Sequence, residues 1–347
     1  MWYSDIRRKG SLTSNDNSRV DLTKYPCVCI DARRTTFRDD AIGLRPRADT
    51  NRRVDLMASK WEVLVHITDV SDIYLTVETP PDGVDTLNAH LSALRNAARG
   101  RGISRYDLPF GPLHLFPPKA LEAMSFSKDA DGQPAVTLWA YIDERDGRII
   151  DAGLERTLIS APIQLAFGKA TSLMESVSID SGDAQLRALL LIAERNLSRW
   201  NLRQRQVSEA ARKRETRLKR RENLTAALGN SRDHRDILPD DGTGGFQLSR
   251  SHRLVDYALD LYGSTLSALI RKEGAPMPVA IGADTSRGGR VATAPLRRYI
   301  DGEMQRQAVA VLCKTGKKLT MSECKEIGRK ANASRNSVSN YRSIKRH

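Results

Sequence analysis

The sequence predicts an α+β fold on the strength of three observations. Short runs of apolar residues, several alternating with polar ones as in strands, lie in the first half of the chain. Apolar residues at helical spacing dominate from residue 183 onward, and no internal repeat interrupts this order. Strand pairs followed by helices are typical of the α+β class. The 347 residues are enough for one large domain or two ordinary ones.

The first predicted strands lie at residues 26–31 and 61–67. The earlier run is short and apolar, whereas the later one alternates and is rich in Val and Ile. A polar turn at residues 45–53 separates them, so we expect these two strands to pair antiparallel. Cys27 and Cys29 alternate within the first run and would share one strand face, as buried thiols in a reducing compartment.

A second strand pair is predicted at residues 136–142 and 149–163. The first of these runs alternates, and Asp146-Gly147 follows it. This dipeptide favours the left-handed backbone that a tight hairpin turn needs. We therefore expect a β-hairpin in this part of the chain.

Helices are predicted where apolar residues recur every three or four positions. Val84, Leu87, Leu91 and Leu94 follow this spacing, and Gly100 then stops the helix. Similar patterns predict helices at residues 120–126, 183–228, 252–270, 295–312 and 321–347.

The composition divides the chain into three parts. Residues 1–18 are polar and predict an extended arm. Residues 19–312 hold the predicted strands and most helices, which indicates a single large domain. Within it lie a basic helix at 203–222 and a polar, glycine-rich loop at 229–245. Residues 313–347 form a basic helical tail.

The charge of the chain favours a polyanionic partner. There are 56 Lys and Arg against 42 Asp and Glu, for a formal net charge of +14. Nucleic acid is the first expectation and an anionic membrane surface the second. No apolar run approaches the ~20 residues of a membrane span, so we expect no partner in the membrane. The four cysteines match no metal-binding pattern.

Three aspartates form the first candidate site. The strand at 26–31 ends at Asp31, and Asp39-Asp40 follow eight residues later. Carboxylates gathered at a strand end suit Mg²⁺, which prefers oxygen ligands. In a basic protein such a cluster suggests phosphodiester cleavage by metal-activated water. Paired aspartates are also common in turns, and that interpretation stays open here.

Further motifs give these aspartates a family context. They lie in order at residues 19–23, 61–71, 106–109, 116–121 and 293–301. Together with Asp31 and Asp39-Asp40, this set resembles the ribonuclease II family, whose RNB catalytic domain belongs to processive 3′-to-5′ exoribonucleases. The resemblance extends from about residue 19 to about 312. It implies a mixed sheet framed by helices, with an internal channel for single-stranded RNA.

The resemblance also implies roles for five side chains. Asp31, Asp39 and Asp40 match metal-binding aspartates, so the implied cofactor is Mg²⁺. Tyr106 matches the aromatic residue that stacks near the terminal nucleotide, and Arg297 matches the arginine that contacts the scissile phosphate. The implied reaction is hydrolysis that releases nucleoside 5′-monophosphates.

Several positions depart from the family pattern. Phe37 stands where the family has a further aspartate, and a phenyl ring cannot coordinate Mg²⁺. Tyr257 stands where the family has an acidic residue; Asp256 is one helical step away, which turns its side chain by about 100°. Ala294 replaces a serine. We also expect no room in this chain for the flanking oligonucleotide-binding β-barrels of the family's enzymes.

The basic helix is the second candidate site. Between residues 203 and 222, nine Lys and Arg face three Glu. This pattern fits a solvated helix face or a helix that contacts phosphates. The basic residues are Arg203, Arg205, Arg212, Lys213, Arg214, Arg217, Lys219, Arg220 and Arg221.

Two functions follow from these features. The first is a degenerate RNB-fold protein with weak or lost nuclease activity, which binds ribosomal or other single-stranded RNA. It would act beside ribonucleoprotein proteins, as in an organellar ribosome or its assembly machinery, within the cell and in a mitochondrion or other organelle. The alternative is a working Mg²⁺-dependent 3′-to-5′ exoribonuclease. An adaptor without RNA contact is a third reading.

Overall fold

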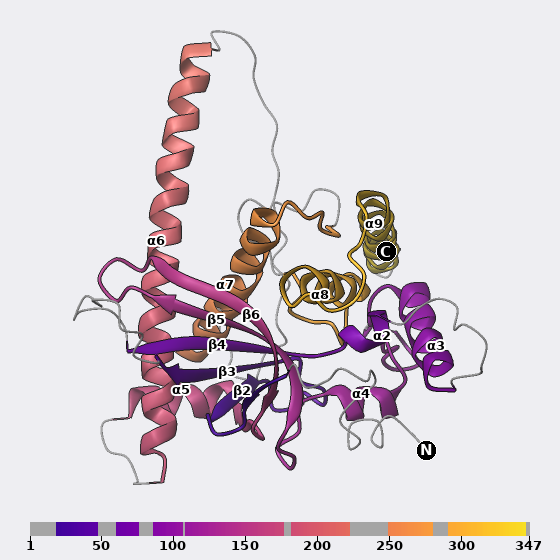
Figure 1. Ribbon diagram of the computed structural model, residues 1–347, viewed down its shortest axis with the longest axis horizontal. Coiled ribbons are helices and arrows are strands. Elements are labelled where there is room, and N and C mark those ends of the chain that lie inside the picture. Colours follow the sequence, from indigo (N-terminus) through magenta and orange to yellow (C-terminus); the bar gives the residue numbers. More distant parts are fainter. Residues whose placement is uncertain are drawn as a thin grey trace.

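A curled, mixed sheet of seven strands forms the centre of the molecule (Figure 1). The computed structural model describes residues 19–47, 60–75, 86–106, 108–176, 182–222, 249–279 and 291–344. The predicted arm at 1–18 and polar loop at 229–245 lie outside them. The strands are β1 (Val20–Leu22), β2 (Cys27–Asp31), β3 (Asp40–Pro46), β4 (Trp61–Thr68), β5 (Gln133–Ile142), β6 (Ile149–Ile159) and β7 (Ile163–Ala166), in the order β1-β6-β5-β4-β3-β2-β7.

The sheet corrects one predicted pairing. β2 and β4 do not pair with each other, because β3 lies between them and pairs antiparallel with both. The sequence pattern missed β3, whose Gly43 weakens the strand signal. Gly43 is needed there, since a Cβ atom at this position would lie 2.9 Å from Nε2 of His66.

The second predicted hairpin is confirmed. β5 and β6 pair antiparallel, with Gln133 opposite Ile159 and Ile142 opposite Ile149. The predicted run to residue 163 is divided, however. β6 ends at Ile159, and β7 pairs parallel with β2 at the far edge of the sheet.

Helices follow most of the predicted ranges. They are α2 (Ser71–Leu75), α3 (Thr86–Arg101), α4 (Pro118–Met124), α5 (Phe167–Glu175), α6 (Ala184–Glu222), α7 (Arg250–Lys272), α8 (Tyr299–Leu312) and α9 (Met321–Ile344). The periodicity did not predict α2 or α5. α8 begins four residues later than predicted, because residues 295–297 form a turn.

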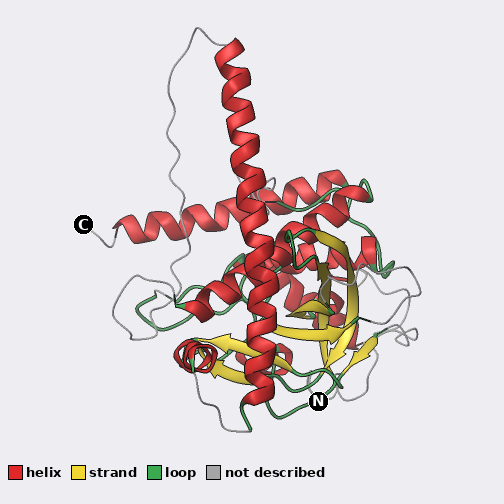
Figure 2. Cartoon of the chain, turned by 90° about the vertical axis from the view of Figure 1, so that its left-hand side faces the viewer, coloured by secondary structure: helices red, strands yellow, loops and turns green. Residues whose placement is uncertain are grey.

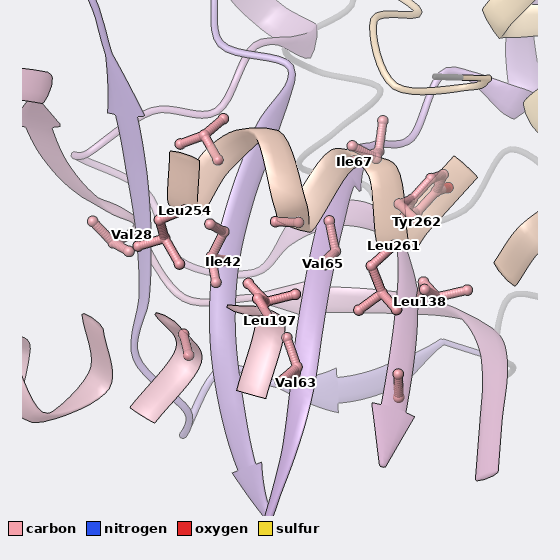
Figure 3. Packing of buried hydrophobic residues seen from close by; sticks show 14 of the residues in the cluster. Val28, Ile42, Val63, Val65, Ile67, Leu138, Leu197, Leu254, Leu261 and Tyr262 are labelled. Carbon is pink, nitrogen blue, oxygen red and sulfur yellow. The ribbon is translucent and has the colours of Figure 1, made fainter. Parts of the chain in front are cut away.

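The main core lies between one face of the sheet and the helices α5, α6, α7 and α8. Strand residues such as Val28, Ile42 and Val65 meet Leu197 of α6 and Leu254 of α7 (Figure 3). All five are at most 3% exposed. Burial of such side chains contributes about 1.5–3 kcal/mol each, so this contact is a principal source of stability.

The opposite face of β2 holds the two alternating cysteines. Cys27 and Cys29 are 1% exposed and pack in a small cluster with Phe126. Burial raises the pKa of Cys27 to about 12, with a smaller opposing effect from Ser160. These thiols are therefore the buried strand residues that the alternation predicted.

The helix α6 packs on the core with its first half and extends beyond the body with its second half (Figures 1 and 2). Trp200 is 3% exposed and is the packing anchor near the point of departure. Gly147, in the β5–β6 turn, has a φ of 72° and leaves no space for a Cβ beside the carbonyl of Arg199. The hairpin turn therefore packs directly on the α6 backbone.

The helix α8 is buried although it carries several charged and amide side chains. Glu303, fully buried, accepts hydrogen bonds from Arg95, from Arg306 and from the Tyr299 hydroxyl at 2.6–3.2 Å. Buried charge is tolerated when it is paired in this way. Among the described residues, no helix is long and apolar enough to cross a bilayer.

Candidate functional site

The candidate site lies where the ends of β2 and β4 meet the start of β3, beside a turn at residues 294–297. A short antiparallel contact brings a distant segment to this turn. The N–H of Ser104 donates to the carbonyl of Arg297 at 2.8 Å, and the N–H of Tyr299 donates to the carbonyl of Gly102 at 2.9 Å. This contact carries Tyr106 to the neighbourhood of Arg297.

Asp39 is the buried centre of the site, with its side chain only 1% exposed. One carboxylate oxygen accepts the N–H of Leu296 at 2.9 Å, and the other accepts Nε–H of Arg297 at 2.9 Å. Burial raises the pKa of Asp39, and Arg297 and the Leu296 N–H oppose that rise. The charge of Asp39 in turn raises the pKa of Arg297. Both oxygens of Asp39 are therefore engaged within the chain.

Asp31 has a second arginine beside it. Nε of Arg38 lies 3.6 Å from a carboxylate oxygen of Asp31. Burial raises the pKa of Asp31 to about 6; Arg38 and Arg297 lower it, and Asp39 raises it. These mutual effects show that two carboxylates and two guanidinium groups share one small region.

The three predicted metal ligands are near in sequence but do not form a ligand set here. Asp40 is the first residue of β3 and follows Asp39 directly, and both carboxylates raise the pKa of Arg297. In the part of the chain that the structure describes, no group of three His, Cys, Asp or Glu residues could hold a metal ion. Arginines on Asp31 and Asp39 occupy the positions that a cation would need. The residues in this arrangement do not fit Mg²⁺.

Phe37 reinforces this conclusion. Its ring packs against a further hydrophobic cluster, which includes Phe116, Leu121 and Leu296. The ring also meets His114 edge to face, with ring centroids 5.3 Å apart. Tyr106 contacts the same imidazole at 5.8 Å. Phe37, which stands where the family has an aspartate, thus belongs to a row of three rings and supplies no oxygen ligand for a metal ion.

Two predicted functional side chains face solvent. Tyr106 is 58% exposed, and the Arg297 side chain is 46% exposed. Burial of the Tyr106 hydroxyl raises its pKa, an effect that nearby Arg297 opposes. The structure therefore brings Asp31, Asp39, Tyr106 and Arg297 together, with a ring and a guanidinium accessible from outside.

The other departures have structural roles. Tyr257 is partly buried and packs against the main core. The N–H of Ala294 donates to Asp301 at 2.9 Å, which holds the 294–297 turn to the start of α8. Beyond this turn, Gln305 of α8 donates to the carbonyl of Thr68 and accepts the N–H of Val70, each at 2.8 Å, which connects α8 to the end of β4.

Sequence reasoning missed Arg38 and the pairing of both arginines. A signal was available, because the β2–β3 connection carries Arg33, Arg34 and Arg38 beside the aspartates. It also missed a buried ion network in which Arg19 and Arg156 bind Asp69 at 2.8 and 3.1 Å.

Asp69 itself caps a turn. Its Oδ1 accepts the N–H of Ser71 at 2.8 Å and the Ser71 hydroxyl at 2.6 Å. The position next to the site therefore supports the β4–α2 turn and is not part of a metal site.

The basic helix contributes fewer described side chains than the sequence predicted for it. Arg203 pairs with Asp146 at 3.0 Å, and Arg205 is exposed. The helix is described to Glu222, but the side chains from residue 211 on lie outside the described part. The phosphate-contacting role of Arg212, Lys213, Arg214, Arg217, Lys219, Arg220 and Arg221 stays a prediction.

This fold and this arrangement of aspartates, tyrosine and arginine define an RNB-type protein. A family model of the RNB domain matches residues 19–282, so the chain belongs to the RNB domain family. The resemblance noted in the sequence is thereby confirmed. No curated protein sequence matches the chain significantly.

Solved structures confirm the fold. RNase R of Mycoplasma genitalium, in complex with ribose-methylated single-stranded RNA, has a TM-score of 0.64 at 12% identity, over 97% of this chain and 59% of its own. Dss1 exoribonuclease of Candida glabrata, an active-site mutant, has a TM-score of 0.62 at 12% identity, over 97% and 47%. Yeast Ssd1, described as a pseudonuclease, has a TM-score of 0.57 at 15% identity, over 94% and 44%. The chain thus spans about half the length of these proteins.

Proposed function

We propose that this protein binds single-stranded RNA on an RNB fold and does not hydrolyse it efficiently. The observation that carries the proposal is the state of Asp39. Both of its carboxylate oxygens accept hydrogen bonds from the 294–297 turn, one of them from Arg297 at 2.9 Å. A metal-dependent nuclease needs such oxygens to hold the ion that activates water.

The energetic argument supports a weak or lost activity. A cation at Asp39 would compete with two hydrogen bonds for the carboxylate oxygens and would lie beside the positive charge of Arg297. Loss of either hydrogen bond would cost about 1–3 kcal/mol. Arg38 beside Asp31 adds a like charge that repels the cation, and Phe37 offers no compensating ligand.

RNA as the partner rests on three observations of different kinds. The chain belongs to the RNB family, and its structural neighbour RNase R has been solved with single-stranded RNA. The net charge is +14. At the site itself, the exposed ring of Tyr106 and the exposed guanidinium of Arg297 suit a base and a phosphate.

The experiment has two readouts on the same protein. Fluorescence polarisation measures binding of a labelled single-stranded RNA, and a 3′-labelled RNA with Mg²⁺ reports release of mononucleotides. We expect binding without appreciable release. Asp39→Asn should leave the release assay at background, as should the exposed control Asp129→Asn. Rapid Mg²⁺-dependent release that Asp39→Asn abolishes would refute the loss of activity.

The alternative is an active exoribonuclease, favoured by the gathering of Asp31, Asp39, Tyr106 and Arg297 in one region. In that case Asp31, Asp39 and Asp40 would hold Mg²⁺ after the two arginines move aside. A titration of Mg²⁺ distinguishes the two functions, because only the alternative requires release to saturate with the ion.

The wider setting belongs to the same proposal. A basic RNA-binding protein without catalysis fits a place in a larger ribonucleoprotein, such as an organellar ribosome or its assembly machinery, with a mitochondrial or other organellar address. Sedimentation of the tagged chain from isolated organelles provides the test. Co-migration with ribosomal particles that ribonuclease treatment abolishes supports this setting, and migration as free protein contradicts it.

A further inference from the structure

The backbone of Arg38 is held by hydrogen bonds on both sides, and its side chain lies beside the candidate site. Its N–H donates to Oγ of Ser125 at 2.7 Å, and its carbonyl accepts the N–H of Phe126 at 3.2 Å. The segment after α4 therefore holds the Arg38 backbone on both sides. From this fixed origin, Nε of the side chain reaches to 3.6 Å from Asp31.

Arg38 and Arg297 approach the site in the same manner. Each presents Nε to one carboxylate, Arg38 to Asp31 and Arg297 to Asp39. A guanidinium group has five N–H donors, so this contact leaves terminal Nη–H groups for another acceptor. The side chains are 20% and 46% exposed, which gives that acceptor access from solvent.

The two guanidinium groups offer hydrogen-bond donors to an anion. Asp31 and Asp39 each have an arginine beside them, and Asp40 adds a third carboxylate near Arg297, so an arriving divalent cation meets positive groups as well as carboxylates. A phosphate meets the same two groups as donors, and arginine binds phosphate with good geometry and strength. Beside Arg297, the exposed ring of Tyr106 offers a stacking face for an attached nucleobase.

We propose that Arg38 and Arg297 together bind one phosphate of single-stranded RNA, and that this site works without a divalent cation. The inference rests on the proposed function, and it specifies which chemical group of the RNA, a phosphate, binds at this site. Arg38 is the new element, because the chain places a second guanidinium group beside Asp31, where the family resemblance implies a metal ion.

Fluorescence polarisation with a labelled single-stranded RNA tests the site, in EDTA and in Mg²⁺. We expect equal affinity in both. Arg38→Gln should weaken binding roughly tenfold and lower the slope of log affinity against log salt by about one. Arg38→Lys should recover part of the affinity. Arg148→Gln is the matched control, since Arg148 lies in the β5–β6 turn at the opposite end of the sheet, and it should retain wild-type affinity.

The outcomes separate the site from the function. Binding that vanishes in EDTA and returns with Mg²⁺ overturns the inference. So does wild-type affinity in both Arg38→Gln and Arg297→Gln, although RNA binding itself would then stand. A wild-type protein that binds no RNA under either condition refutes the proposed function. Thermal melting of each variant shows that the fold is intact.

Discussion

Arg297 and Asp39 lie 258 residues apart in the chain, and their side chains meet at 2.9 Å. Together with the hydrogen bond from Leu296 to Asp39, this contact fastens the turn before α8 to the start of β3. A carboxylate that the family resemblance assigns to metal binding thus connects two distant parts of the fold. Loss of the Asp39 carboxylate should therefore lower the stability of the fold as well as affect any catalytic activity of the site.

Asp39→Asn should destabilise the protein by about 1–3 kcal/mol. The amide removes the charge that Arg297 faces, and it can place an N–H where an acceptor is needed. Urea denaturation followed by circular dichroism measures the change, with Asp129→Asn as a surface control of the same chemistry. An unchanged midpoint would show that the contact with Arg297 is not structural.

Asp31 should make stability depend on pH in a defined window. Burial raises its pKa from 3.8 to about 6. A carboxyl whose pKa is higher in the folded state favours folding most when protonated, so this contribution is present below about pH 4 and is lost as the pH rises through 6. Asp31→Asn, which stays neutral, should therefore gain melting temperature relative to the wild type between pH 4 and 7. A constant difference across that range contradicts the shift.

Asp69 should give the opposite dependence. Burial alone would raise its pKa, but Arg156 and Arg19 lower it below the ordinary value of 3.8. The contribution of Asp69 is then fully present above about pH 4 and is lost progressively as the pH falls from there through the lowered pKa of the folded state. Asp69→Asn should cost about 3 kcal/mol at pH 7, because it leaves Asp72 as the remaining anion for the two buried arginines Arg19 and Arg156. Denaturation at pH 7 and at about pH 2 checks both statements, since the lower value lies well below the unfolded pKa. An equal cost at the two values would exclude this role.

Phe37→Asp, which restores the family's aspartate, should not restore hydrolysis. Arg38 and Arg297 still occupy Asp31 and Asp39, and the new carboxylate would replace a ring packed against His114. We expect no Mg²⁺-dependent release of mononucleotides and a loss of about 2 kcal/mol in stability. Phe37→Leu serves as the control for packing. Release of mononucleotides by Phe37→Asp alone would show that the other carboxylates are available to the metal.

The sequence was sufficient for the fold class and for the long helices, because these depend on local periodicity. It failed at β3, because Gly43 broke the strand pattern of this segment. The structure shows that this segment is the central partner of both β2 and β4. Burial between two strands supplies the stability that local propensity does not.

The sequence indicated which residues gather at the candidate site, but not which partners their carboxylates bind. The order of motifs led to Asp31, Asp39, Tyr106 and Arg297, and the structure gathers them. Whether a carboxylate holds a metal or an arginine depends on contacts between residues far apart in the chain. The one local indication that the aspartates pair with arginines was Arg38, which precedes Asp39 directly in the sequence.

The arrangement of α6 and the candidate site has a consequence for binding that neither shows alone. β5 begins beside the site, and the turn after it packs on α6 where that helix leaves the body. The ten residues of β5 span about 33 Å, so the two basic regions stand at opposite ends of the sheet. An RNA long enough to contact both regions would bind more tightly, because its second contact forms at a high effective concentration. A shorter RNA would contact only one of the two regions. The affinity of the protein for RNA would then increase once the RNA is long enough to reach both regions.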